Sequence, residues 1–74
     1  MRKINLTDEW QALTGDSIII QATATAILYI GDEAPSANSP GFTLKWNVPI
    51  EFDVLKYGGF AAVRGTGNVT VVES

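Results

Sequence analysis

The sequence contains no cysteine and no histidine. The absence of cysteine excludes disulfides and thiolate metal sites, and the absence of histidine removes the commonest protein ligand of transition metals. With 74 residues there is room for one domain, residues 1–74. A domain of this size buries only about 60% of the surface that its unfolded chain exposes. Association with other copies is the remaining way to stabilise it, so we expect a homo-oligomer, with a trimer favoured.

Basic residues are few. Five Lys and Arg stand against eight Asp and Glu, which gives a formal net charge of −3. Nucleic-acid binding depends largely on clustered basic side chains, so this composition predicts no nucleic-acid surface. The basic residues are instead scattered along the chain: Arg2, Lys3, Lys45, Lys56 and Arg64.

Long hydrophobic runs are also missing. No stretch approaches the roughly 20 apolar residues of a membrane span, so no membrane partner is expected. The basic pair Arg2 and Lys3 is not followed by the apolar core of a secretory signal. We expect the protein to stay in the cytoplasm in which it is made, unless a particle carries it out.

Strand-forming residues dominate what is present. Short apolar runs are interrupted by Gly, Pro, Asn or Asp at intervals of roughly 8–12 residues, which is typical of a β-sandwich or barrel. The best candidate for a helix is Thr7–Leu13, which we interpret as a short turn or an irregular strand. The sequence therefore predicts an all-β fold, a small antiparallel β-sandwich or barrel of about seven strands.

One segment in the first half of the chain has the pattern of a central strand. Residues 17–22 contain three consecutive isoleucines, which indicates a strand buried on both faces. This interpretation predicts a bend at residues 23–25, after which residues 26–30 return as the antiparallel partner of 17–22. Residues 42–46 then alternate with period two, and the shared face of Phe42, Leu44 and Trp46 is core or interface.

The second half predicts three further strands. Residues 50–54 alternate between apolar and acidic side chains, and a turn follows at 56–59. Residues 60–64 and 69–72 are the last two strands. Gly65–Asn68 between them is typical of a hairpin connection, because its residues tolerate positive φ. The segment lacks the lysine and the strand-to-helix context of a phosphate-binding loop, so no nucleotide cofactor is expected.

Acidic residues supply the only candidate chemistry. Glu51 and Asp53 are the one close pair on the same face of a predicted strand, and a small hydrolase that uses them as paired carboxylates is one alternative. Asp16, Asp32 and Glu33 could offer oxygen ligands to Ca²⁺, but their spacing matches no calcium loop. All five of these acidic residues are also expected simply because acidic side chains are common on solvent-facing strand positions and in turns. We expect no catalysis, no cofactor and no metal requirement.

Aromatic residues offer a second alternative. Trp10, Tyr29, Trp46 and Tyr57 are amphipathic rings of the kind that stack on sugars or fill a small core. A carbohydrate-binding β-module for adhesion to a host surface would use them as a platform. Core packing explains most of them equally well.

Four successive segments carry a family resemblance. They read "EWQALTGDS", "IIIQATATAILYIGD", "EAPSANSPGFTL" and "YGGFAAVRGTGNVTVVE", and together they cover nearly the whole chain. In order and character they resemble the small all-β structural proteins of tailed-phage virions, of the capsid decoration, head-fibre or tail-associated type. The resemblance implies a bacteriophage structural protein that binds a larger capsid or tail protein. It also implies a location in the virion, with assembly in the host cytoplasm.

Two segments depart from the pattern of that family. Thr23–Thr25 stands where its members often have an Asn/Gly turn, and Lys45–Asn47 stands where a glycine turn is common. These departures concern local turns more than the fold.

The loop at residues 32–41 is the predicted contact region. Its two prolines stiffen it, so that little conformational entropy is lost when it docks on a partner. Rigid aromatic side chains near it would act as anchors. The alternative is that the loop only crosses between two sheets. The predicted interface residues are Pro35, Pro40, Phe42, Trp46 and Tyr57.

Overall fold

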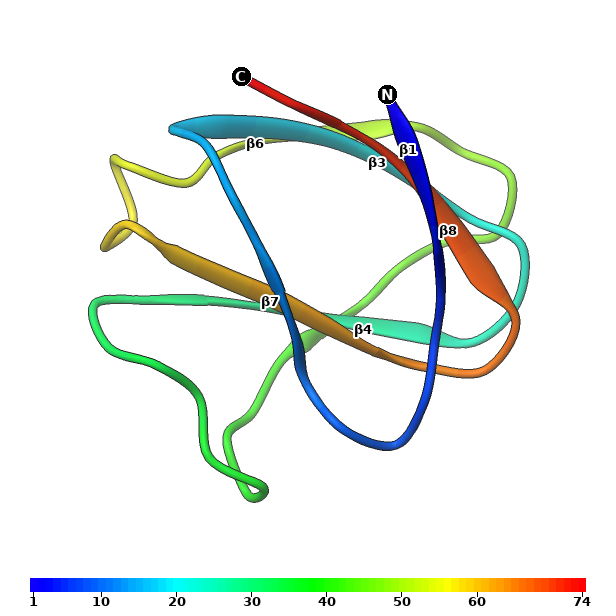
Figure 1. Cartoon of the computed structure of the whole chain (residues 1–74), viewed down its shortest axis with the longest axis horizontal. Coiled ribbons are helices and arrows are strands. Elements are labelled where there is room, and N and C mark those ends of the chain that lie inside the picture. Colours follow the sequence, from blue (N-terminus) through cyan, green and yellow to red (C-terminus); the bar gives the residue numbers. More distant parts are fainter.

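The computed structural model describes all 74 residues as two four-stranded antiparallel sheets that pack face to face (Figure 1). The predicted small antiparallel β-sandwich is confirmed, with eight strands rather than about seven. No helix is present that could cross a membrane. The strands are β1 (Arg2–Asn5), β2 (Gln11–Leu13), β3 (Ser17–Ala22), β4 (Ala26–Gly31), β5 (Phe42–Thr43), β6 (Ile50–Asp53), β7 (Phe60–Gly65) and β8 (Asn68–Glu73).

The two sheets correspond to two halves of one sheet that folds over on itself. The first sheet has the order β1-β8-β3-β6 and the second has the order β2-β7-β4-β5, so every strand of one continues along the chain into the matching strand of the other. The pairing of β3 with β8 places Ala22 opposite Val69. The pairing of β4 with β7 places Ala26 opposite Gly65, which is the same register four residues further on. The sandwich therefore has a bend at one end and free edges at β1/β2 and at β5/β6.

The bend is held by hydrogen bonds between its two adjacent connections. Thr23 N donates to Asn68 O at 3.1 Å, and Thr66 N donates to Thr25 O at 2.8 Å. Gly65 has a φ of 146°, and a Cβ there would collide with the carbonyl oxygen of Thr25. Glycine at this position therefore lets the two connections approach each other closely.

Two predicted hairpins are wrong because of this bend. β4 does not return along β3 but pairs with β7 and β5 in the second sheet. β7 and β8 likewise lie in different sheets, although only two residues separate them. Residues that permit positive φ serve an arch between sheets as well as a hairpin turn, so the local sequence did not distinguish the two.

The core lies between the sheets and comprises a cluster of 14 buried apolar residues. β3 lies between β8 and β6, so its predicted central position is confirmed. Its predicted burial on both faces is wrong. Ile18 and Ile20 are each 1% exposed, whereas Ile19 is 41% exposed on the outer face. The sheet is antiparallel with one face toward the core, and that arrangement leaves the other face open to solvent.

The edge strands follow the predicted alternation in part. In β6, Glu51 and Asp53 are exposed, whereas Ile50 and Phe52 are partly buried and turn inward, as predicted. In residues 42–46, Leu44 is buried in the core, but Phe42 and Trp46 are largely exposed. β5 is the outermost strand of its sheet, so an inward-facing side chain there is covered on one side only. The predicted turn or irregular strand at residues 7–13 contains the edge strand β2.

Candidate functional site

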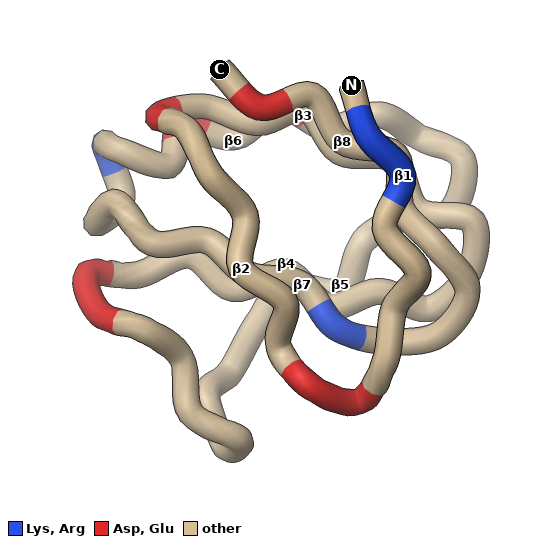
Figure 2. The backbone as a smooth tube through the Cα atoms, in the orientation of Figure 1, with Lys and Arg blue, Asp and Glu red and all other residues tan.

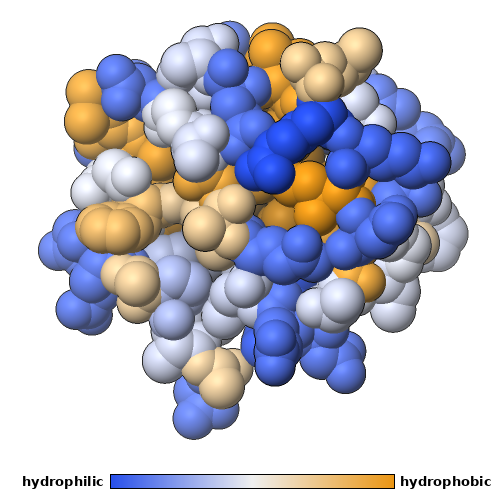
Figure 3. Space-filling view, in the orientation of Figure 1, coloured by the Kyte–Doolittle hydropathy of each residue, from blue (hydrophilic) through white to orange (hydrophobic).

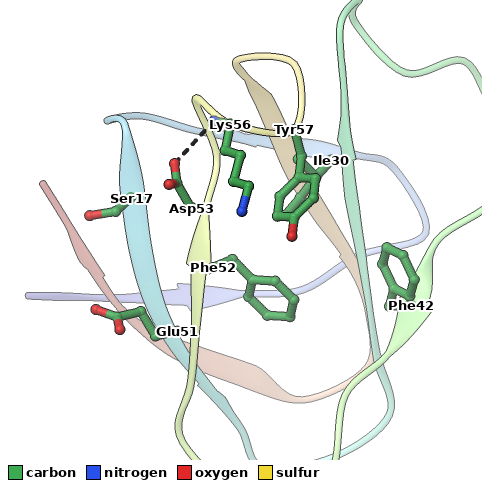
Figure 4. Close-up of a pocket in the computed structure, with 8 residues that line it drawn as sticks. All are labelled: Ser17, Ile30, Phe42, Glu51, Phe52, Asp53, Lys56 and Tyr57. Carbon is green, nitrogen blue, oxygen red and sulfur yellow. Dashed lines mark hydrogen bonds between the residues drawn. The ribbon is translucent and has the colours of Figure 1, made fainter.

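A groove of about 870 Å³ opens along the free edge where β6 of the first sheet faces β4 and β5 of the second. Figure 4 shows the side chains that form its walls. The residues that line it are Ser17, Ile30, Phe42, Glu51, Phe52, Asp53, Lys56 and Tyr57.

The apolar wall of the groove comes from side chains that face the interior of the sandwich at its edge. Phe52 extends from β6 into the groove on the side of Phe42, which lies at the start of β5 (Figure 4). Ile30 of β4 packs against the core cluster beside them, as Phe52 does. Since no further strand covers β5 or β6, Phe42 remains 63% exposed.

The turn between β6 and β7 supplies the remaining wall. Asp53 Oδ1 accepts a hydrogen bond from Lys56 N at 3.0 Å, which fixes the start of the turn. Lys56 Nζ lies 5.7 Å from the ring centre of Tyr57, within the range of a cation–π contact. Gly58 has a φ of 128°, and a Cβ there would collide with the backbone of Gly31. The turn is therefore seated directly on the end of β4.

The two carboxylates do not face each other across the groove. Glu51 and Asp53 lie on the outer face of β6, and Figure 4 shows Glu51 pointing to the opposite side of the strand from Phe52. Asp53 already caps the turn through Lys56 N. This arrangement differs from that of paired carboxylates, which flank a scissile bond from both sides.

The structure brings two of the predicted interface residues together and separates a third. Phe42 and Tyr57 both line the groove. Trp46 is 60% exposed but forms a bridge with Ala22, at the bend end of β3, whereas Ser17 at the other end of β3 lines the groove. The five-residue step along β3 from Ser17 to Ala22 spans roughly 17 Å, so Trp46 and the groove lie at opposite ends of this strand.

The two prolines of the predicted interface lie away from the groove. Pro35 lines a second depression of about 280 Å³ together with Trp10 and Arg64, and Pro40 is exposed in the loop. The loop begins at the end of β4 and ends at β5, which are neighbours in the same sheet. The alternative that it crosses between two sheets is therefore wrong.

Three side chains hold this loop by hydrogen bonds to its backbone. Trp10 Nε1 donates to Ser36 O at 2.7 Å, Arg64 Nη1 donates to Ala37 O at 3.0 Å, and the Tyr29 hydroxyl donates to Glu33 O at 2.6 Å. The predicted interface residues included the two prolines of this loop but none of these three anchors. The signal that could have found them is the presence of polar aromatic and basic side chains on, or directly before, strands next to a long loop.

The four aromatic residues of the carbohydrate hypothesis do not form one platform. The rings of Trp10 and Tyr29 lie 5.9 Å apart at an angle of 57°, and the Arg64 guanidinium lies 4.5 Å from the centre of the Trp10 ring. These two rings are engaged with the loop. Trp46 and Tyr57 are exposed at opposite ends of the sandwich.

The acidic residues considered for Ca²⁺ do not assemble. No group of three or more acidic side chains in the structure is placed to hold a metal ion. Asp16, Asp32 and Glu33 therefore do not form the oxygen cage that such a site requires.

Comparison of the chain with family models, with curated proteins and with solved structures finds no match. The geometry of this end of the sandwich and the sequence segments that resemble phage virion proteins are the two features of the chain that bear on function.

Proposed function

We propose that this protein is a structural subunit of a tailed-phage virion, which binds a larger capsid or tail protein and associates with copies of itself. A single observation supports it most: large apolar side chains gather, exposed, at the end of the sandwich opposite the bend. We call this set the mouth rim. Its members and exposures are Phe42 63%, Leu55 63%, Tyr57 59% and Phe60 48%.

The mouth rim is held on a constrained backbone. Gly59 N donates to Val54 O at 2.9 Å, which closes the β6–β7 turn and keeps Leu55, Tyr57 and Phe60 on one short segment. Phe42 lines the same groove as Tyr57. In Figure 3, apolar atoms on the left of the view lie over this turn. Aromatic and aliphatic anchors that are already ordered lose little entropy on docking, which favours a protein interface.

The virion context comes from the family resemblance, and the self-association comes from the small size of the core. A trimer is the stoichiometry we favour. The virion, reached from the host cytoplasm during assembly, is the corresponding location. The geometry adds no support for the hydrolase alternative, because Glu51 and Asp53 lie on one outer strand face.

The test is co-sedimentation with phage particles that lack the native protein. A variant with Leu55→Ser and Tyr57→Ser should bind particles at least about tenfold more weakly, since it removes two central anchors. Trp46→Ser with Val48→Ser is the matched control, because it removes two exposed apolar side chains from the other end of the sandwich. The control should bind like the parent.

Two outcomes would contradict the proposal. If the mouth-rim variant bound particles as well as the parent, this surface would not be the contact. If soluble host glycans, and not particles, protected Tyr57 or Trp46 from chemical modification, the carbohydrate-binding alternative would replace it.

A further inference from the structure

The two free edges of the first sheet carry opposite charges. β1 presents Lys3, and β6 presents Glu51 and Asp53. Figure 2 shows basic residues on β1 and acidic residues near β6, on opposite sides of the sheet. The only ion pair of the molecule joins Arg2 to Glu73, so the ammonium of Lys3 and the carboxylates on β6 are unpaired.

These charges also lie on the same face of the sheet. Lys3 is opposite Thr70, next to the inward pair Ile4 and Val69, so it points to the outer face. Glu51 is opposite Ile19 on that same outer face. A second copy placed beside β6 in the same orientation would therefore bring basic and acidic side chains onto one surface.

The strand directions agree with such an arrangement. Each neighbouring pair in the order β1-β8-β3-β6 is antiparallel, so β1 and β6 run in opposite directions. A neighbouring copy in the same orientation then offers its β1 antiparallel to β6. The sheet would continue from one copy into the next without a change of hand or of face.

We propose that copies of this protein associate head-to-tail, with β1 of one copy added as an antiparallel strand to β6 of the next. The proposal rests on the homo-oligomeric part of the proposed function and names the two surfaces that meet. A head-to-tail contact closes into a ring when its rotation allows and otherwise continues as a filament.

One register satisfies both charge and hydrogen bonding. With Lys3 opposite Glu51 of the neighbouring copy, Ile4 is opposite Ile50 and Asn5 is opposite Pro49. Pro49 has no N–H to donate. The Asn5 carbonyl does not need one, because it already accepts a hydrogen bond from Gln11 Nε2 at 2.8 Å. Pro49, which directly precedes β6 and has no N–H, thus faces a carbonyl of β1 that already has a hydrogen-bond donor.

Symmetric pairing of like edges is disfavoured by the same charges. Opposite residues of an antiparallel pair share a face, so β6 against β6 would place Glu51 and Asp53 of one copy against the same carboxylates of the other. β1 against β1 would bring Lys3 next to Lys3. Strand addition at β6 would also cover Phe52 in the groove wall, which removes apolar surface from water.

Charge reversal tests this contact by light scattering over a wide dilution range. The parent should dissociate at a measurable concentration. Lys3→Glu and Glu51→Lys should each raise that concentration at least about tenfold, and the two changes in one chain should restore it, since the pair is then re-formed with the signs exchanged. An equimolar mixture of the two single variants should also re-associate.

Two controls make the same charge changes elsewhere. Lys45→Glu and Glu33→Lys alter exposed side chains that make no hydrogen bond, and both should associate like the parent. Melting curves establish that each variant is folded. If a reversal variant unfolds, Lys3→Gln and Glu51→Gln take its place and should weaken association in the same direction.

Several results would overturn the inference. These are a parent that is monomeric at all concentrations, single variants that associate like the parent, or a double variant that remains as weak as the single ones. Particle binding separates this failure from that of the proposed function. A monomeric parent that still sediments with particles contradicts only the head-to-tail contact, whereas an associating parent that ignores particles contradicts only the virion role.

Discussion

The guanidinium of Arg2 donates two hydrogen bonds to the carboxylate of Glu73, from Nε at 2.6 Å and from Nη2 at 3.0 Å. Glu73 Oε2 also accepts from Thr14 N at 2.7 Å and from Thr14 Oγ1 at 2.9 Å. One carboxylate thus joins the start of β1, the end of β8 and the residue that follows β2. The bonds from Arg2, then those from Thr14, hold the pKa of Glu73 at about 2, below its ordinary value of 4.5.

This interaction predicts a loss of stability in acid. The folded-state pKa is lower than the unfolded one, so the stabilisation is complete above about pH 5 and is lost as the pH falls toward 2. Free energies of unfolding measured from pH 7 to pH 2 should fall more steeply for the parent than for Glu73→Gln. At pH 7 the variant should be less stable by about 1–3 kcal/mol. Equal acid dependence of the two proteins would show that Glu73 is not the group responsible.

Neighbouring isoleucines of β3 should respond very differently to the same substitution. Ile20→Asp places an unpaired carboxylate in the core and should unfold the protein, since such burial costs several kcal/mol. Ile19→Asp places the carboxylate on the outer face, opposite Glu51, and should cost about 1 kcal/mol or less. Thermal melts compare them directly. Unfolding by Ile19→Asp would mean that the outer face of the first sheet is covered.

Alanine substitutions at two adjacent glycines can distinguish the cost of a steric collision from the cost of backbone strain. Gly58 and Gly59 both have positive φ, at 128° and 95°. A Cβ on Gly58 would collide with the Gly31 backbone, whereas a Cβ on Gly59 meets nothing within 4 Å. Gly59→Ala should therefore cost about 1–2 kcal/mol of backbone strain, and Gly58→Ala should cost clearly more. Denaturant unfolding measures both. Equal costs would contradict the close seating of the turn on β4.

The anchoring of the loop at residues 32–41 can be tested by removing one hydrogen bond. Trp10→Phe keeps most of the ring but removes the donor to Ser36 O, so the fold should persist while the loop opens more often. Limited proteolysis or amide hydrogen exchange within residues 34–39 should increase severalfold. Trp46→Phe is the matched control, because Trp46 is exposed and its indole makes no hydrogen bond. An unchanged rate for Trp10→Phe would show that other contacts alone order the loop.

Local pattern was sufficient to predict most of the strands. The alternation of residues 50–54 correctly assigned Glu51 and Asp53 to the solvent face, because a side-chain period of two follows from strand geometry alone. The same reasoning predicted an all-β sandwich and a central strand at residues 17–22. Part of the mouth rim was predictable too, since Phe42 and Tyr57 were named as rigid aromatic anchors, and both line the groove.

Pairing between strands was decided only by the tertiary structure. Short, flexible segments such as residues 23–25 and 66–67 are compatible with a hairpin or with an arch, and the choice depends on contacts with segments distant in the chain. Here each connection bonds to the other, and the sheet folds over between them. The groove, the mouth rim and the opposite charges of β1 and β6 all result from that fold, because an edge of a sheet exists only once every strand has found its neighbours.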